Sequence, residues 1–136
     1  MFDLKTRILI AEDVLPMRLM IVQTCKSIGF RNLSEATNGK EAWDMLSLNA
    51  PPIGLVISDW NMPEISGLEF LKMAREDPRF KKLPFVMVTV EDDEDRVVEC
   101  IKARVSGYII KPFTIAQFKK KLEEVHQRSI APPQQN

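Results

Sequence analysis

Short, continuously apolar runs alternate along this chain with longer segments of helical periodicity, and this alternation constrains the fold more than any other feature. A strand that is apolar at every position is typical of a parallel sheet buried on both faces by helices. The pattern therefore predicts an α/β fold built on one parallel sheet. The apolar runs are Ile8 to Ala11, Leu55 to Ser58, Phe85 to Val88 and Tyr108 to Ile110.

A fifth, less apolar run from Arg31 to Ala36 reads as an edge strand. Each run is followed by a helical segment, which makes five strand-then-helix units. Right-handed crossovers then require helices on both faces of the sheet. We therefore expect a flavodoxin-like, doubly wound five-stranded parallel sheet with five helices, in the strand order 2-1-3-4-5.

Turn and capping residues predict where the helices begin and end. Pro16 and Gly29 bound the first helix, and Asn38-Gly39 leads into a second from Lys40 to Leu48. Ser66 caps the third, the acidic run Glu91 to Asp95 opens the fourth, and Thr114 with Gln117 forms a capping box for the fifth. The residues expected to face inward are Leu15, Leu19, Val22 and Ile28; Ala42, Met45 and Leu46; Leu68, Leu71 and Ala74; Val97, Val98 and Ile101; and Ile115, Phe118, Leu122 and Val125.

Polar side chains follow four of the apolar runs at the point where each run ends. Glu12 and Asp13 follow the first run, Asp59 the second, Thr89 the third and Lys111 the last. Because the carboxyl ends of neighbouring parallel strands lie at one edge of a sheet, these five side chains should converge on one crevice. Crowded carboxylates repel one another unless a cation lies among them, and oxygen ligands favour Mg²⁺.

Each of these residues also has an ordinary structural interpretation when it is taken alone. Glu12 and Asp13 could cap a helix, and Asp59 could start a turn. Thr89 suits a strand, and Lys111 could be a surface lysine at a strand end. Their common position at the end of successive strands favours a shared site over five separate explanations.

The same residues carry a family resemblance. Glu12-Asp13, Asp59 to Pro63, Ser66-Gly67, Thr89 and the stretch Gly107 to Phe113 resemble the receiver domain of two-component response regulators. The resemblance runs from about Arg7 to Arg128, and among receivers it is greatest to the stand-alone chemotaxis type. It predicts a receiver domain over residues 1–128. The composition of residues 129–136, with two prolines and two glutamines, predicts a disordered tail, either a loose end or a linker stub.

The resemblance implies a role for each site residue. Asp59 would accept the phosphoryl group, with Glu12, Asp13 and the backbone carbonyl of Asn61 around Mg²⁺. Thr89 and Lys111 would bind phosphoryl oxygens.

The resemblance also implies roles for residues around this centre. Tyr108 would switch rotamer with Thr89, and Asn61 with Glu91 would tune hydrolysis of the phosphoaspartate. The Lys111–Pro112 peptide bond would be cis, and Pro112 would thereby shape the loop. Val90 stands where the family usually has alanine or another small residue, so it could crowd entry to the site.

The function that follows is a phosphorylation switch and not an enzyme. Its donor would be a phosphohistidine on a sensor histidine kinase or a phosphotransfer protein, and its output a target protein bound through the face of the fourth helix, fifth strand and fifth helix. A phosphorylation-independent scaffold and a small phosphatase with an aspartate nucleophile are the alternatives.

Composition narrows the remaining possibilities. Nineteen basic residues balance nineteen acidic ones, so no overall field favours nucleic acid or a membrane surface, and the lysine runs 81–82 and 119–121 read as solvated surface. Two cysteines and one histidine predict neither a disulfide framework nor a zinc site. We expect a cytoplasmic protein, since no apolar stretch suits a signal peptide or a membrane span.

Overall fold

The computed structural model describes residues 1–90 and 93–130. In these ranges five strands form one parallel sheet in the order β2-β1-β3-β4-β5, as predicted. The strands are β1 (Ile8–Ala11), β2 (Leu33–Ala36), β3 (Leu55–Ser58), β4 (Phe85–Thr89) and β5 (Gly107–Ile110). The apolar runs thus locate four strands to within a residue, and β2 lies at an edge as expected.

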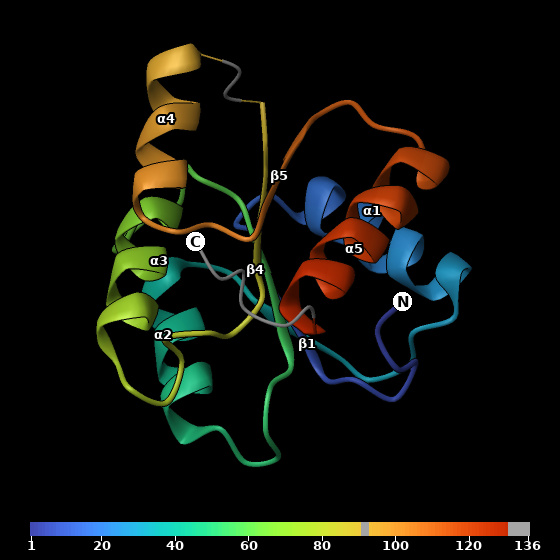
Figure 1. Ribbon diagram of the computed structural model, residues 1–136, viewed down its shortest axis with the longest axis horizontal. Helices are drawn as coiled ribbons and strands as arrows, with labels where there is room; N and C mark the ends of the chain where they lie inside the picture. Colours follow the sequence, from blue (N-terminus) through green and yellow to red (C-terminus); the bar gives the residue numbers. More distant parts are fainter. Residues whose placement is uncertain (91–92, 131–136) are drawn as a thin grey trace, which may run out of the picture.

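Helices cover both faces of the sheet (Figure 1). One layer holds α2 (Gly39–Leu48), α3 (Gly67–Glu76) and α4 (Glu94–Lys102), and the other holds α1 (Leu15–Ile28) and α5 (Ile115–Ile130). Every residue of β1, β3 and β4 is buried. Alternate strand residues therefore feed two separate cores: Leu9, Val56 and Met87 face the α2–α4 layer, and Ile10, Ile57 and Val86 face the α1–α5 layer.

The predicted capping residues act where the sequence placed them. The Ser66 hydroxyl accepts from the Glu69 backbone N–H at 3.1 Å, and the Glu69 carboxylate accepts from the Ser66 N–H. Thr114 and Gln117 make the same reciprocal pair at the start of α5. Gly29 ends α1 with φ 122°, a conformation in the region that favours glycine.

Three helix faces differ from the prediction. Leu15 and Leu19 of α1 are 53% and 45% exposed, and α1 instead buries residues on the stripe of Ile21 and Cys25. This helix carries more apolar residues than one face can hold, so the sequence pattern alone did not fix its rotation.

The prediction for α4 was wrong at two positions and that for α5 at one. Val98, Ile101 and Ile115 are all exposed, and Cys100 is the only fully buried residue of α4 among those described. These side chains lie on helices at the β5 end of the sheet, where nothing in the described structure covers their outer side.

Two expectations fall outside the described ranges. Glu91 and residues 131–136 belong to the part of the chain that the structure does not describe, so the boundary at Arg128 stays a prediction; α5 itself continues to Ile130. Within residues 1–90 and 93–130, every helix is too short or too polar to span a lipid bilayer.

Candidate functional site

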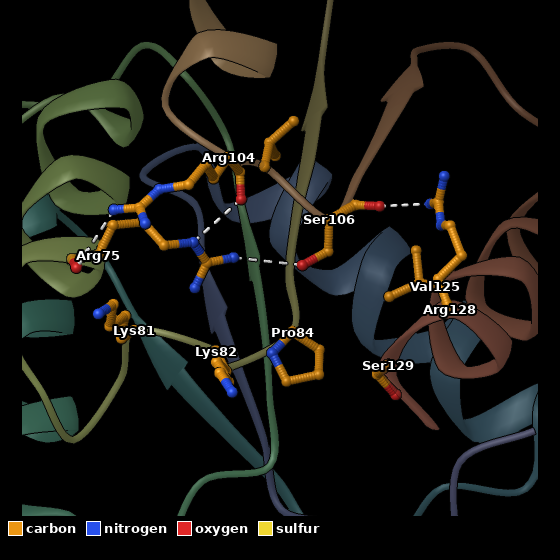
Figure 2. A pocket seen from close by; sticks show the side chains of 10 residues that line it. Arg75, Lys81, Lys82, Pro84, Arg104, Ser106, Val125, Arg128 and Ser129 are labelled. Carbon is orange, nitrogen blue, oxygen red and sulfur yellow. Dashed lines mark hydrogen bonds between the residues drawn. The ribbon is translucent and has the colours of Figure 1, made fainter. Parts of the chain in front are cut away.

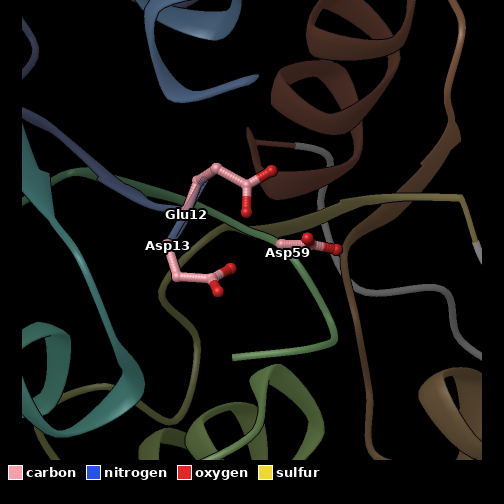
Figure 3. A group of neighbouring side chains, drawn as sticks. All are labelled: Glu12, Asp13 and Asp59. Atoms are coloured by element: carbon pink, nitrogen blue, oxygen red, sulfur yellow. The ribbon is translucent and has the colours of Figure 1, made fainter. Parts of the chain in front are cut away.

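The pairing of β1 with β3 brings the predicted carboxylates together. Ala11 pairs with Ser58 at the ends of these strands, and the Asp59 N–H donates to the Ala11 carbonyl at 3.0 Å. Glu12 and Asp13 follow Ala11 directly, so they must lie beside Asp59. Each of the three residues offers a carboxylate oxygen within 4.8 Å of the other two (Figure 3).

Glu12 and Lys111 form a buried ion pair at the base of this cluster. The Lys111 Nζ donates to Glu12 Oε1 at 2.6 Å, and the two side chains are 5% and 0% exposed. Burial raises the pKa of Glu12 to about 7; the Lys111 ammonium opposes this shift, and neighbouring Asp59 adds to it. The second oxygen of Glu12, Oε2, is buried and has no hydrogen-bond partner.

Lys111 also connects β5 to the neighbouring strand ends. Its Nζ lies 3.5 Å from Asp59 Oδ2, and its backbone N–H donates to the Thr89 carbonyl at 2.9 Å. Thr89 is fully buried at the carboxyl end of β4. The Lys111–Pro112 peptide bond is cis, as the resemblance implied. The structure thus gathers residues from β1, β3, β4 and β5 at one edge of the sheet.

The loop that follows Asp59 packs against two glycines whose part in the site the sequence did not reveal. A Cβ atom on Gly67 would lie 1.9 Å from the Asp59 carbonyl oxygen, and one on Gly39 would lie 1.9 Å from the Ile65 carbonyl oxygen. The Gly67 N–H also donates to the Trp60 carbonyl at 2.7 Å. Glycine at these positions lets α2 and α3 approach the loop, which holds the Asp59 backbone in place.

Asp59 itself is oriented by its own neighbours. Its Oδ1 accepts from the Trp60 N–H at 2.6 Å, and it is 9% exposed. Trp60 is buried, and the guanidinium of Arg96 from α4 lies 5.2 Å from its ring centroid, within range of a cation–π contact. No sequence signal indicated this contact, because it joins segments that are far apart in the chain.

Arg18 is a second residue that sequence reasoning did not identify. It donates to the Glu12 carbonyl and to Glu35 Oε1, both at 3.0 Å, so it ties α1 and β2 to the end of β1. Only its position in the sequence, one turn into α1, could have indicated this role, since a cation there can reach back to the end of the preceding strand.

The other predicted residues lie around the cluster. Asn61 is exposed on the loop after Asp59, and Tyr108 is half-buried on β5 against the α2–α4 core. Val90 is 62% exposed just after β4.

The donor set fits a hard divalent cation. Three carboxylates within 4.8 Å of one another repel in its absence, and the orphaned Glu12 Oε2 is a buried acceptor that still requires a partner. The site therefore combines carboxylates suited to a cation with one ammonium group, that of Lys111, suited to an anion.

Comparison with known proteins agrees with this geometry. The sequence pattern of the response regulator receiver domain matches residues 8–123. The chain is 42% identical over 119 residues to the chemotaxis protein CheY1 of Helicobacter pylori, covering 88% of this chain and 95% of that protein. It is 38% identical over 122 residues to the chemotaxis protein CheY of Pseudomonas aeruginosa, covering 90% and 97%.

The fold matches as well. The structure of the chemotaxis protein CheY4 of Vibrio cholerae superposes with a TM-score of 0.80 at 28% identity, covering 89% of this chain and 98% of that one. The strand order, the acidic cluster and these similarities lead to one conclusion. The chain belongs to the response regulator receiver domain family, and it is a CheY-like phosphoacceptor of two-component signalling, not a classical enzyme.

Proposed function

We propose that Asp59 receives the phosphoryl group and that Glu12, Asp13, Thr89 and Lys111 assist its transfer. The observation that carries this assignment is the position of the Asp59 carboxylate, which lies within 4.8 Å of the Glu12 and Asp13 oxygens and 3.5 Å from the Lys111 ammonium. Membership of the receiver family implies a histidine kinase as the signalling partner. We further propose that the immediate donor is a phosphohistidine on that kinase or on a phosphotransfer protein.

The reaction is an in-line displacement at phosphorus. An oxygen of the Asp59 carboxylate forms a P–O bond as the P–N bond to the donor imidazole breaks, and the bonding electrons leave with the imidazole nitrogen. The hydrogen bond from the Trp60 N–H fixes the plane of the carboxylate before the attack. Lys111 and Thr89 bind equatorial oxygens of the phosphoryl group, where charge is spread in the transition state.

Glu12, Asp13, Asp59 and the backbone carbonyl of Asn61 would hold Mg²⁺. When bound, the cation supplies positive charge that offsets the crowded carboxylates and the phosphoryl oxygens. We also assign Asn61 and Glu91 to control of the water that hydrolyses the phosphoaspartate, and Pro112 to the shape of the Lys111 loop. The exposure of Asn61 beside Asp59 supports its part of this assignment.

The output surface is the face formed by α4, β5 and α5. Its described side chains include exposed Ile101, Ile110 and Ile115, and a cavity of about 370 Å³ lined in part by Tyr108 and Lys121 lies next to Lys111. Thr89 moving toward the phosphoryl group would leave space for the half-buried Tyr108, which shifts the population between two packings of this face. A target protein reads that shift, and the names of the relatives favour a chemotaxis pathway.

Two further assignments complete the proposal. We assign the receiver domain to residues 1–128, which extends the family match by a few residues at each end. We assign the protein to the cytoplasm, where its partner kinase would present the phosphohistidine; the two free, buried cysteines suit a reducing compartment.

Intact-protein mass spectrometry after incubation with acetyl phosphate and Mg²⁺ tests the central assignment. The wild type should gain the mass of one phosphoryl group, and Asp59→Asn should gain none. Mg²⁺ should also change the fluorescence of Trp60, and Asp13→Ala should abolish that change while Trp43 contributes a constant background. A wild-type protein that never gains the mass, or that gains it on another residue, would refute the proposal.

A further inference from the structure

A cavity of about 360 Å³ lies at the end of the sheet where the strands begin, opposite to Asp59. Figure 2 shows the residues that line it. Two of its lining residues, Pro84 and Ser106, directly precede β4 and β5. Asp59, in contrast, directly follows β3. Because all five strands run parallel, the residues that precede the strands lie at one end of the sheet and the residues that follow them lie at the other end. The cavity is therefore separate from the phosphorylation site.

The lining of this cavity is strongly cationic. Of the described residues that line it, none is acidic and five are basic: Arg75, Lys81, Lys82, Arg104 and Arg128. Across the described ranges, none of the five lies within 4.0 Å of a carboxylate oxygen. Positive charges gathered without counter-charges produce a local potential that attracts anions, even in a chain whose formal net charge is zero. We call this site the cationic pocket.

Arg75 is the buried member of the cationic pocket. It is 6% exposed, and its guanidinium donates to the carbonyls of Arg104, Phe80 and Leu83 and to the Ser106 hydroxyl, at 2.7 to 3.2 Å. All four acceptors are neutral, so these bonds position the charge without neutralising it. Burial, and secondarily the charge of Arg104, lowers the pKa of Arg75 to about 10.

Arg104 occupies a backbone conformation that favours glycine. Its φ is 65°, and it follows α4 where the Val105 N–H returns to the Cys100 carbonyl and the Arg104 N–H to the Ile101 carbonyl. This hydrogen-bond pattern is the helix C-terminal motif in which glycine is usual. An arginine there carries a conformational cost, which a role for its side chain would explain.

We propose that the cationic pocket binds a compact, multiply charged phosphate anion, of the class of a di- or triphosphate chain. Its volume falls in the range of small-ligand sites, roughly 300 to 1,000 Å³. Its apolar lining is limited to Pro84, Val105 and Val125, with no aromatic ring among the described lining residues on which a nucleobase could stack. Recognition therefore rests on the phosphate groups, for which guanidinium and ammonium groups are suited donors.

Titration calorimetry of the whole chain with sodium tripolyphosphate tests this proposal. The buffer would hold low salt and EDTA without Mg²⁺, so that the anion cannot bind through a cation at the carboxylate cluster. We expect saturable binding that weakens steeply as salt is raised. ATP serves as a second probe: equal affinity identifies a free phosphate chain as the ligand, and tighter binding identifies a nucleotide, either of which supports a phosphate site.

Two variants locate the site. Arg104→Gly removes a cation and relieves the strained backbone, so binding should weaken about tenfold, the loss expected for one charge-assisted contact, while the melting temperature stays level or rises. Lys82→Gln should also weaken binding, whereas Lys72→Gln, which removes an exposed cation of α3 outside the cavity, should leave it unchanged.

The outcomes separate this proposal from the one for Asp59. At physiological salt, Asp59→Asn should bind tripolyphosphate as the wild type does, whether or not Asp59 is the phosphoacceptor. No binding by about 1 mM tripolyphosphate at low salt, equal affinity in the Arg104→Gly, Lys82→Gln double variant, or tighter binding of an oligoglutamate peptide would each overturn the proposal.

Discussion

Substitution of Gly67 by alanine tests how tightly the loop after Asp59 is held. The new Cβ would lie 1.9 Å from the Asp59 carbonyl oxygen and 3.0 Å from the Trp60 Cα, both backbone atoms. No side-chain rotation can relieve such a contact. The start of α3 and the loop must therefore move apart by about 1 Å before the closest contact reaches the 3.0 Å lower limit of real Cβ contacts.

The size of the effect follows from what this movement breaks. Overpacking against a rigid neighbour costs about 1 to 3 kcal/mol, and weakening the hydrogen bond from the Gly67 N–H to the Trp60 carbonyl adds about 1 kcal/mol. We expect a loss of about 3 kcal/mol in the free energy of unfolding. In a domain of this size that corresponds to a melting temperature lower by about 10 °C.

Urea and thermal unfolding followed by far-UV circular dichroism measure this loss without depending on the fluorescence of Trp60. Gly54→Ala is the matched control, because its Cβ would meet the Thr6 methyl group at 2.8 Å, the end of a half-buried side chain that can move. The control should lose less than about 1 kcal/mol. The displaced Asp59 backbone should also slow phosphorylation by acetyl phosphate, up to about a hundredfold. A Gly67→Ala protein as stable as Gly54→Ala would refute the reasoning.

Three further predictions concern the cores and the helix ends. Phe118→Ala, at a fully buried ring packed 5.1 Å from that of Phe113, should cost about 3 to 5 kcal/mol in urea unfolding, and a loss below about 1 kcal/mol would contradict its place in the core. Ser66→Ala removes the capping box of α3 and should lower the free energy of unfolding by about 1 kcal/mol in the same assay. An unchanged free energy of unfolding would show that the cap does not stabilise the protein. Burial raises the pKa of Cys25 and of Cys100 to about 12, so both thiols stay protonated between pH 7 and 9. Labelling of the folded protein by a thiol reagent should therefore stay slow across that range. A fast labelling rate that increases with pH while the protein is still folded would contradict this prediction.

The strands were predictable because burial on both faces leaves a strong local signal. The residues from Ile8 to Ala11 and from Leu55 to Ser58 are apolar or small and are all buried, so their sequence alone reports their environment. Helix rotation was less predictable. In α1, Leu19 and Ile21 are equally apolar, and only the position of the neighbouring helix and sheet decides that Ile21 is buried and Leu19 is exposed.

The residues of the candidate site likewise fall into those that the sequence could predict and those that it could not. Asp59 and Lys111 could be predicted from strand ends, because the parallel topology alone brings those ends together. The roles of Gly39 and Gly67 could not be predicted, although Gly67 belongs to the motif that carries the resemblance, since their importance lies in loop backbone atoms that come within 2 Å of a hypothetical Cβ. Arg75 was likewise missed, because a single arginine on a helix gives no sign that it is buried beneath four neutral acceptors.

This chain has a formal net charge of zero, yet it carries two charged sites at opposite ends of the strands of one sheet. β4 starts at Phe85, next to Pro84 of the cationic pocket, and ends at Thr89 beside the acidic cluster. The length of one strand therefore separates the two sites. At about 3.3 Å a residue, a five-residue strand spans roughly 17 Å, which is about twice the Debye length of about 8 Å at physiological salt. Solvent-exposed charges at the two sites are therefore largely screened from each other at physiological salt. Charge changes at one site, such as Asp59→Asn, should leave anion binding at the other unaltered at physiological salt and begin to affect it as the salt falls toward about 0.01 M, where the Debye length of about 30 Å exceeds the separation of the two sites.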